Sequence, residues 1–184
     1  MKVVAILGSP HADGNTSYLV DEALKEISSQ GIETEKILLA EHSISPCQGH
    51  DKCHTFTVCK IKDDAPGIIK KYNEADAVIL ASPVYFYDVS AQMKTFIDRN
   101  FFTFTHNGKK KAKCAGLIAI GGGEGADETL RTLRAFVGMP DDACFTTSGY
   151  VGQDSVKSKP ELVKKAKEMG SKMAGKLGKG KGKS

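Results

Sequence analysis

The 184-residue sequence contains no tryptophan, and no aromatic residues interleave with the lysines near its end. Proteins that bind single-stranded nucleic acid combine stacking aromatics with a basic groove, so this absence argues against that class of partner. The longest apolar runs also fall far short of the roughly 20 residues that a membrane helix needs. We therefore expect no nucleic-acid partner and no membrane partner. Because no signal-like segment precedes the first apolar run, we expect a cytoplasmic location.

The net charge of +4 is unevenly distributed along the chain. From Lys157 onward there are ten lysines against two glutamates, so the body before them is mildly acidic. Residues 178–184 consist of glycine, lysine and a final serine, and we interpret them as a basic disordered tail. Residues 1–177 have the length and composition of a single globular domain.

A loop of small polar residues follows the apolar segment 2–7 and precedes a helical pattern. It reads Gly8-Ser9-Pro10-His11-Ala12-Asp13-Gly14-Asn15-Thr16-Ser17. A strand, a loop and a helix start in this order direct backbone N–H groups and hydroxyls at one point beside the positive end of the helix dipole. The loop is therefore a candidate phosphate site. The alternative is an ordinary turn in which Asn15 or Thr16 caps the helix.

This loop lacks the marks of three other phosphate sites. No Lys-Ser/Thr pair closes it, and Gly8 and Gly14 do not fit the G-x-G-x-x-G pattern, so metal–ATP chemistry and a Rossmann dinucleotide site are both disfavoured. The loop also contains neither cysteine nor arginine, which a phosphatase of the low-molecular-weight type needs there. The composition of the loop therefore excludes a phosphatase of that type.

Short apolar segments alternate with helical patterns along the chain. Strands are predicted at residues 2–7, 34–39, 77–81, 114–120 and 143–148. Helices are predicted from Ser17 to about Gln30, after Asp63 or Asp64, after Ser90, up to Gly138, and after the capping box Ser158–Glu161. This alternation predicts an α/β fold, a doubly wound five-stranded parallel sheet with helices on both faces.

Ligands of such sheets bind outside the carboxyl ends of the strands, at the point where the strand order reverses. Three loops qualify, because residues 8–16, 82–89 and 121–124 follow the first, third and fourth predicted strands. They offer a phosphate cradle, an aromatic wall, and a glycine turn that lets backbone approach a flat ring. A phosphorylated planar aromatic ligand suits all three loops, and flavin mononucleotide (FMN) is the obvious candidate.

The five cysteines are of two kinds. Cys114 and Cys144 lie inside apolar segments and are interpreted as buried core residues. Cys47, Cys53 and Cys59 lie together in a polar stretch without clear periodicity. In a cytosolic chain such a cluster favours metal or redox chemistry over a disulfide framework.

Two sequence motifs in this chain are informative in combination. They are Gly8-Ser9-Pro10 with Gly14-Asn15-Thr16, and Ser82-Pro83-Val84-Tyr85-Phe86 with the segment Ser90–Arg99. Together they resemble the NAD(P)H-dependent FMN reductase and iron-sulfur flavoprotein family, over about residues 2–150. The resemblance implies a flavodoxin-like sheet of order 2-1-3-4-5 with FMN at its carboxyl edge. The implied phosphate ligands are Ser9, Asn15, Thr16 and Ser17, and the implied ring contacts are Pro83, Val84, Tyr85, Phe86, Gly121, Gly122, Gly123 and Glu124.

Position 11 departs from the family pattern. Such loops commonly have arginine there, whereas this sequence has His11. Either His11 places a titratable group beside the phosphate, or it is a surface residue without a role.

The resemblance implies an FMN-dependent oxidoreductase that takes electrons from NAD(P)H or a reduced protein donor and passes them to a flavin, a quinone or another acceptor. The flavin itself takes the hydride, so no catalytic side chain is required. The alternative is a non-enzymatic FMN electron carrier, or a redox sensor of the iron-sulfur flavoprotein type. The resemblance also suggests a homo-oligomer.

The cysteine-containing loop at about residues 40–62 departs from the pattern of the iron-sulfur members. Those carry C-x-x-C-x-x-C and a fourth cysteine, whereas this chain has Cys47, His50, Cys53 and Cys59, with an imidazole as the second ligand. Three thiolates and one imidazole could hold an iron-sulfur cluster or a zinc ion. The third outcome is an empty loop, with reduced thiols or a disulfide between Cys47 and Cys53.

Overall fold

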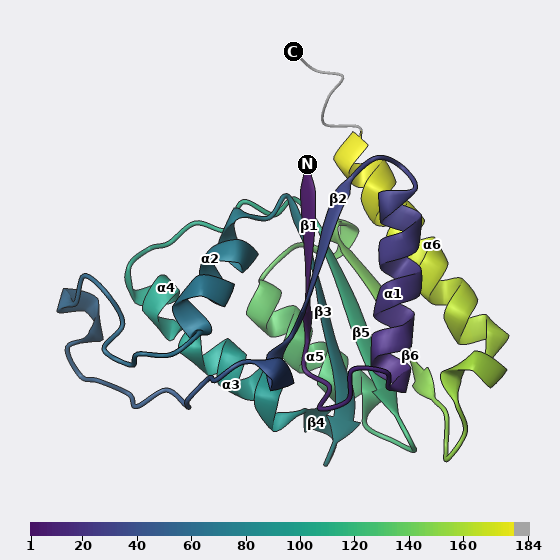
Figure 1. Ribbon diagram of the computed structural model, residues 1–184, viewed down its shortest axis with the longest axis horizontal. Helices are drawn as coiled ribbons and strands as arrows, with labels where there is room; N and C mark the ends of the chain where they lie inside the picture. Colours follow the sequence, from purple (N-terminus) through teal and green to yellow (C-terminus); the bar gives the residue numbers. More distant parts are fainter. Residues whose placement is uncertain (179–184) are drawn as a thin grey trace.

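The computed structural model describes residues 1–178, which form one sheet with helices on both faces (Figure 1). Five parallel strands follow the order β2-β1-β3-β5-β6. They are β1 (Lys2–Leu7), β2 (Glu33–Leu38), β3 (Ala77–Tyr85), β5 (Ala115–Gly121) and β6 (Cys144–Tyr150). The predicted strand order and α/β fold are confirmed. From residue 179 on, the predicted basic tail lies outside the described residues.

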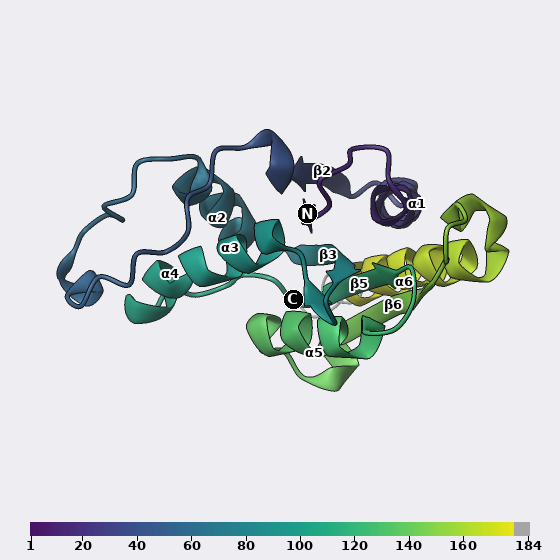
Figure 2. The same ribbon diagram turned by 90° about the horizontal axis from the view of Figure 1, so that it is seen from below.

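Helices cover the sheet in two layers (Figure 2). One layer holds α1 (Asn15–Ser28) and α6 (Pro160–Gly178); the other holds α2 (Ala65–Glu74), α3 (Ala91–Arg99) and α5 (Ala126–Val137). Alternate side chains of β1 enter the two cores: Val3 and Leu7 lie in the core with α1 and α6, whereas Val4 lies in the other. In the part of the chain that the structure describes, no helix could span a membrane.

Two short elements were not predicted from the sequence. Strand β4 (Asp88–Val89) pairs antiparallel with β3, and helix α4 (Phe101–Thr105) follows directly after α3. Short 3₁₀ turns complete the chain at Leu39–Glu41, Cys53–Thr55, Asp141–Ala143 and Val156–Ser158. The alternative interpretation of the first loop, with Asn15 or Thr16 as the helix cap, is wrong, because Gly14 occupies the N-cap and makes no side-chain cap bond. The Ser90 cap is confirmed, since its hydroxyl accepts a hydrogen bond from the backbone N–H of Met93.

Helices α1 and α6 approach each other closely at Gly170, where a Cβ atom would collide with the carbonyl oxygen of Ala23. We expect Gly170→Ala to lower the free energy of unfolding by about 1–3 kcal/mol, because the helix backbones must separate. Gly175 is the matched control: it lies in the same helix with no atom within 4 Å of the added Cβ. Gly175→Ala should stabilise the helix by up to about 1 kcal/mol. Urea unfolding measures both, and equal stability of the two variants would contradict the close contact.

Candidate functional site

A cavity of about 190 Å³ lies where the carboxyl ends of β1, β3, β5 and β6 meet. Four loops line it: the phosphate loop (residues 8–17), the aromatic hairpin (84–89), the glycine turn (121–125) and the loop after β6 (151–158). The lining residues are Ser9, His11, Gly14, Asn15, Thr16, Pro83, Val84, Tyr85, Ile120, Gly121, Gly122, Val151 and Gly152. The structure thus brings the three predicted loops together. It adds the loop after β6, which carries no motif that would have predicted it.

The phosphate loop presents the open first turn of α1 to the cavity. Helix geometry leaves the N–H groups of Asn15, Thr16 and Ser17 without an intrahelical acceptor, and this turn carries no acidic residue. The Thr16 side chain lines the cavity and is buried. An anion placed here would accept N–H hydrogen bonds at the positive end of the helix dipole.

Gly8 packs the phosphate loop directly against the start of α3. A Cβ on Gly8 would lie 2.7 Å from the Cβ of Met93 and 2.8 Å from the Oγ of Ser90. The Ser90 hydroxyl donates to the carbonyl oxygen of Gly8 at 2.6 Å, and the Ser90 N–H donates to the hydroxyl of Ser82 at 2.9 Å. Only glycine leaves room for this junction between β1, β3 and α3.

Three of the predicted phosphate ligands use their side chains to brace the loops. The Ser9 hydroxyl accepts from the N–H of His11 at 3.1 Å, and the Ser17 hydroxyl donates to the carbonyl of Ala12. The Asn15 amide accepts from the N–H of Val156 at 2.8 Å and so ties the phosphate loop to the loop after β6. The groups left to face an anion are the Thr16 hydroxyl, the exposed His11 and the backbone N–H groups of the first turn of α1.

The aromatic hairpin turns at two residues in the left-handed region, Phe86 (φ +48°) and Tyr87 (φ +63°). Such a conformation costs a non-glycine residue about 1–2 kcal/mol, so neighbouring contacts must hold the turn. The Tyr87 hydroxyl donates to Glu124 at 3.1 Å, and this bond raises the pKa of Tyr87 above its usual value. Gly125 (φ +97°) packs beneath, where a Cβ would lie 2.7 Å from the Cα of Tyr87.

The predicted ring contacts therefore divide into two groups. Pro83, Val84, Tyr85, Gly121 and Gly122 line the cavity. Phe86 is fully exposed at the tip of the hairpin, and Glu124 serves as the partner of Tyr87. Gly123 is exposed and does not line the cavity, and no atom lies within 4 Å of a Cβ added there.

The proposed metal ligands Cys47, His50, Cys53 and Cys59 are not brought together. Among residues 1–178, no group of three or more His, Cys, Asp or Glu side chains is placed to hold a metal ion. This arrangement does not fit an iron-sulfur cluster or a zinc ion, which would need these side chains around one centre. The two cysteines interpreted as core residues are buried, and burial raises the pKa of Cys114 to about 11.

Comparison with known proteins identifies the family. A family model described as NADPH-dependent FMN reductase matches residues 1–152. The chain belongs to this family. An iron-sulfur flavoprotein of Archaeoglobus fulgidus is 38% identical over 182 residues, covering 95% of this chain and 79% of that protein. An iron-sulfur flavoprotein of Methanocaldococcus jannaschii is 43% identical over 138 residues, covering 74% and 71%.

Solved structures of lower identity share the fold. RosB with bound 8-demethyl-8-formylriboflavin-5′-phosphate has a TM-score of 0.78 at 19% identity and covers 100% of this chain and 81% of that one. The NAD(P)H:quinone oxidoreductase from Methanothermobacter marburgensis has a TM-score of 0.71 at 15% identity, covering 93% and 96%. The family resemblance that the sequence motifs indicated is confirmed. The chain is an oxidoreductase of the FMN reductase type.

Proposed function

We propose that this chain binds FMN non-covalently at the carboxyl edge of its sheet and transfers electrons from NAD(P)H to a flavin, a quinone or another acceptor. The observation that supports this most strongly is the convergence of the phosphate loop, the aromatic hairpin and the glycine turn on one cavity, in a member of this family. A cytoplasmic location and a homo-oligomeric assembly stay predictions.

Different groups of the chain would bind the phosphate and the ring of FMN. The first turn of α1 and the Thr16 hydroxyl hold the phosphate. Gly121 and Gly122 of the glycine turn line the cavity without side chains, so backbone would contact the ring there. A Cβ on Gly121 would lie 3.2 Å from the Val84 side chain, which is tighter than an ordinary contact. Tyr85, about half exposed, forms one wall. When bound, FMN would supply hydride and single-electron chemistry, and the chain would hold and orient it.

Anaerobic stopped-flow mixing tests the proposed electron transfer. We expect NADH or NADPH to bleach the oxidised flavin absorbance at about 1–10³ s⁻¹, the ordinary range of enzyme turnover, because the proposed reaction passes a hydride from the nicotinamide to the flavin. Dithionite is the control that shows the bound flavin to be reducible. Reduction by dithionite or a protein donor, with none by either nucleotide, would instead support the electron carrier.

A further inference from the structure

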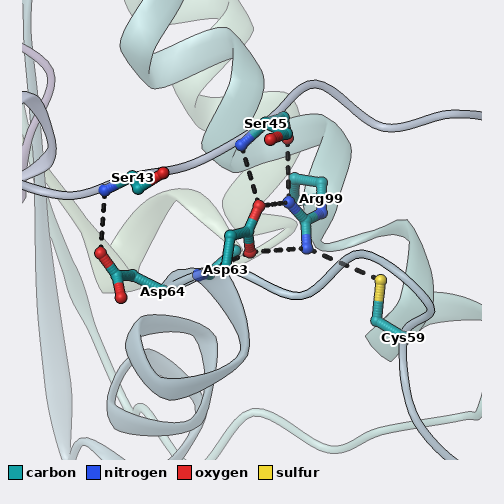
Figure 3. Close-up of polar contacts among 7 residues, drawn as sticks. Ser43, Ser45, Cys59, Asp63, Asp64 and Arg99 are labelled. Atoms are coloured by element: carbon teal, nitrogen blue, oxygen red, sulfur yellow. Dashed lines mark hydrogen bonds and ion pairs between the residues drawn. The ribbon is translucent and has the colours of Figure 1, made fainter.

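The cysteine segment, residues 46–62, extends beyond the helix layer beside α4 (Figures 1 and 2). A buried ion pair lies where the segment joins the body of the domain (Figure 3). Arg99, at the end of α3, pairs with Asp63 through both guanidinium branches, and the two side chains are 1% and 2% exposed. Burial opposes the ionisation of Asp63, but Arg99 and two backbone N–H groups hold its pKa below the usual range.

This Asp63–Arg99 clamp holds the chain on both sides of the segment. Asp63 accepts from the N–H of Ser45 at 2.9 Å, and Arg99 donates to the carbonyl oxygen of Ser45 at 2.9 Å. Arg99 also donates to the sulfur of Cys59 at 3.6 Å, as Figure 3 shows. The clamp therefore fixes the segment's two ends and one of its three thiols with groups of the protein itself.

Helix α4 keeps the thiols apart. Cys47 lines a cavity of about 650 Å³ together with Phe101 and Phe104, whereas Cys59 lines a separate cavity of about 450 Å³ together with Phe102. Residues of α4 border both cavities, so the two thiols line different cavities beside this one short helix.

The middle of the segment is held at the end of the same helix. The Thr105 hydroxyl donates to the sulfur of Cys53 at 3.9 Å, and the His106 ring nitrogen lies 2.7 Å from the carbonyl oxygen of Phe56. His50 packs edge-on against the Phe56 ring, with 5.7 Å between the ring centroids. Gathering the four candidate ligands around one centre would require α4 to move, or Arg99 to release Cys59.

We propose that the cysteine segment is a metal-independent structure, in which the Asp63–Arg99 clamp and α4 take the place of an ion and leave Cys47, Cys53 and Cys59 as separate reduced thiols. The chain would then differ at this segment from its relatives named iron-sulfur flavoproteins. The proposal goes beyond the proposed function, because no residue of the segment lines the flavin cavity.

Metal analysis of protein purified anaerobically from iron- and zinc-supplemented cells tests the proposal. We expect far less than one iron or zinc ion per chain and no acid-labile sulfide. FMN content is measured on the same sample, so failure of the flavin site is seen separately. Stoichiometric iron with sulfide, or stoichiometric zinc, that disappears in Cys53→Ala would overturn the proposal. So would a stoichiometric cluster in His50→Cys, since it would show that α4 does not keep the ligands apart.

Limited proteolysis tests the clamp itself. Arg99→Lys and Asp63→Asn should speed cleavage within residues 46–62 about tenfold or more, because breaking a buried pair lowers the cost of opening the segment. Arg134→Lys is the control, since its pair with Asp141 is largely exposed. If the clamp variants do not fold, chelator treatment of the wild-type protein decides. Cleavage unchanged by chelator supports the proposal, and cleavage accelerated by chelator overturns it.

Discussion

A negative charge in the first turn of α1 should separate FMN from riboflavin. We expect Thr16→Asp to bind FMN about 100-fold more weakly than Thr16→Asn, while the riboflavin affinities of the two variants agree within about threefold. The two side chains have nearly the same shape and differ in one charge. At about 5 Å from a phosphate dianion, that charge costs about 2–7 kcal/mol for effective dielectric constants of about 80 to 20. A 100-fold loss corresponds to about 2.7 kcal/mol.

Titrations followed by quenching of flavin fluorescence measure both affinities in the flavin-free protein. An acidic residue in the first turn is favourable for the helix itself, so Thr16→Asp should remain folded by circular dichroism. If the aspartate weakens FMN and riboflavin equally, the phosphate does not lie at this turn.

Gly125→Ala should have the opposite signature and weaken both flavins together, by about 10–100-fold. The added Cβ would lie 2.7 Å from the Cα of Tyr87 and 2.9 Å from the Val84 side chain, so the aromatic hairpin must move away from the glycine turn. Overpacking of this kind costs about 1–3 kcal/mol, and the wall of the ring site moves with the hairpin. The same fluorescence titrations measure the effect.

Gly138→Ala is the matched control for backbone strain. Gly138 also has a positive φ, +64°, but no atom lies within 4 Å of an added Cβ, and it ends α5 away from the cavity. This variant should lose about 1 kcal/mol of stability and keep both flavin affinities. Unchanged flavin binding in Gly125→Ala would mean that the hairpin does not form the ring site.

The sheet could be predicted because its strands are short apolar runs between helices of regular period. The hairpin strand β4 could not, since its turn residues Phe86 and Tyr87 carry positive φ values without the Asn-Gly or Gly signal that usually marks such turns. Helix α4 is only five residues long and shows no period of its own. Both elements depend on tertiary contacts, such as the bond between Tyr87 and Glu124.

The location of the site was predictable because ligands of such sheets bind at the carboxyl ends of the strands, where the strand order reverses. The loop after β6 escaped prediction because its link to Asn15 joins residues 141 positions apart. The cysteine spacing suggested a metal site, but spacing does not reveal that Arg99, 40 residues further along, donates to Cys59. Motifs thus predicted which loops meet, whereas the partners of individual side chains required the structure.

An amide proton–nitrogen correlation spectrum recorded with and without FMN tests the central claim most directly. The larger cavity of about 650 Å³ beside α4 is a rival location, so the pattern of shifts distinguishes two sites. We expect the shifted amides to cluster in the phosphate loop, the aromatic hairpin, the glycine turn and the loop after β6. Shifts centred on Phe101 and Phe104, with Thr16 and its neighbours unmoved, would contradict the account.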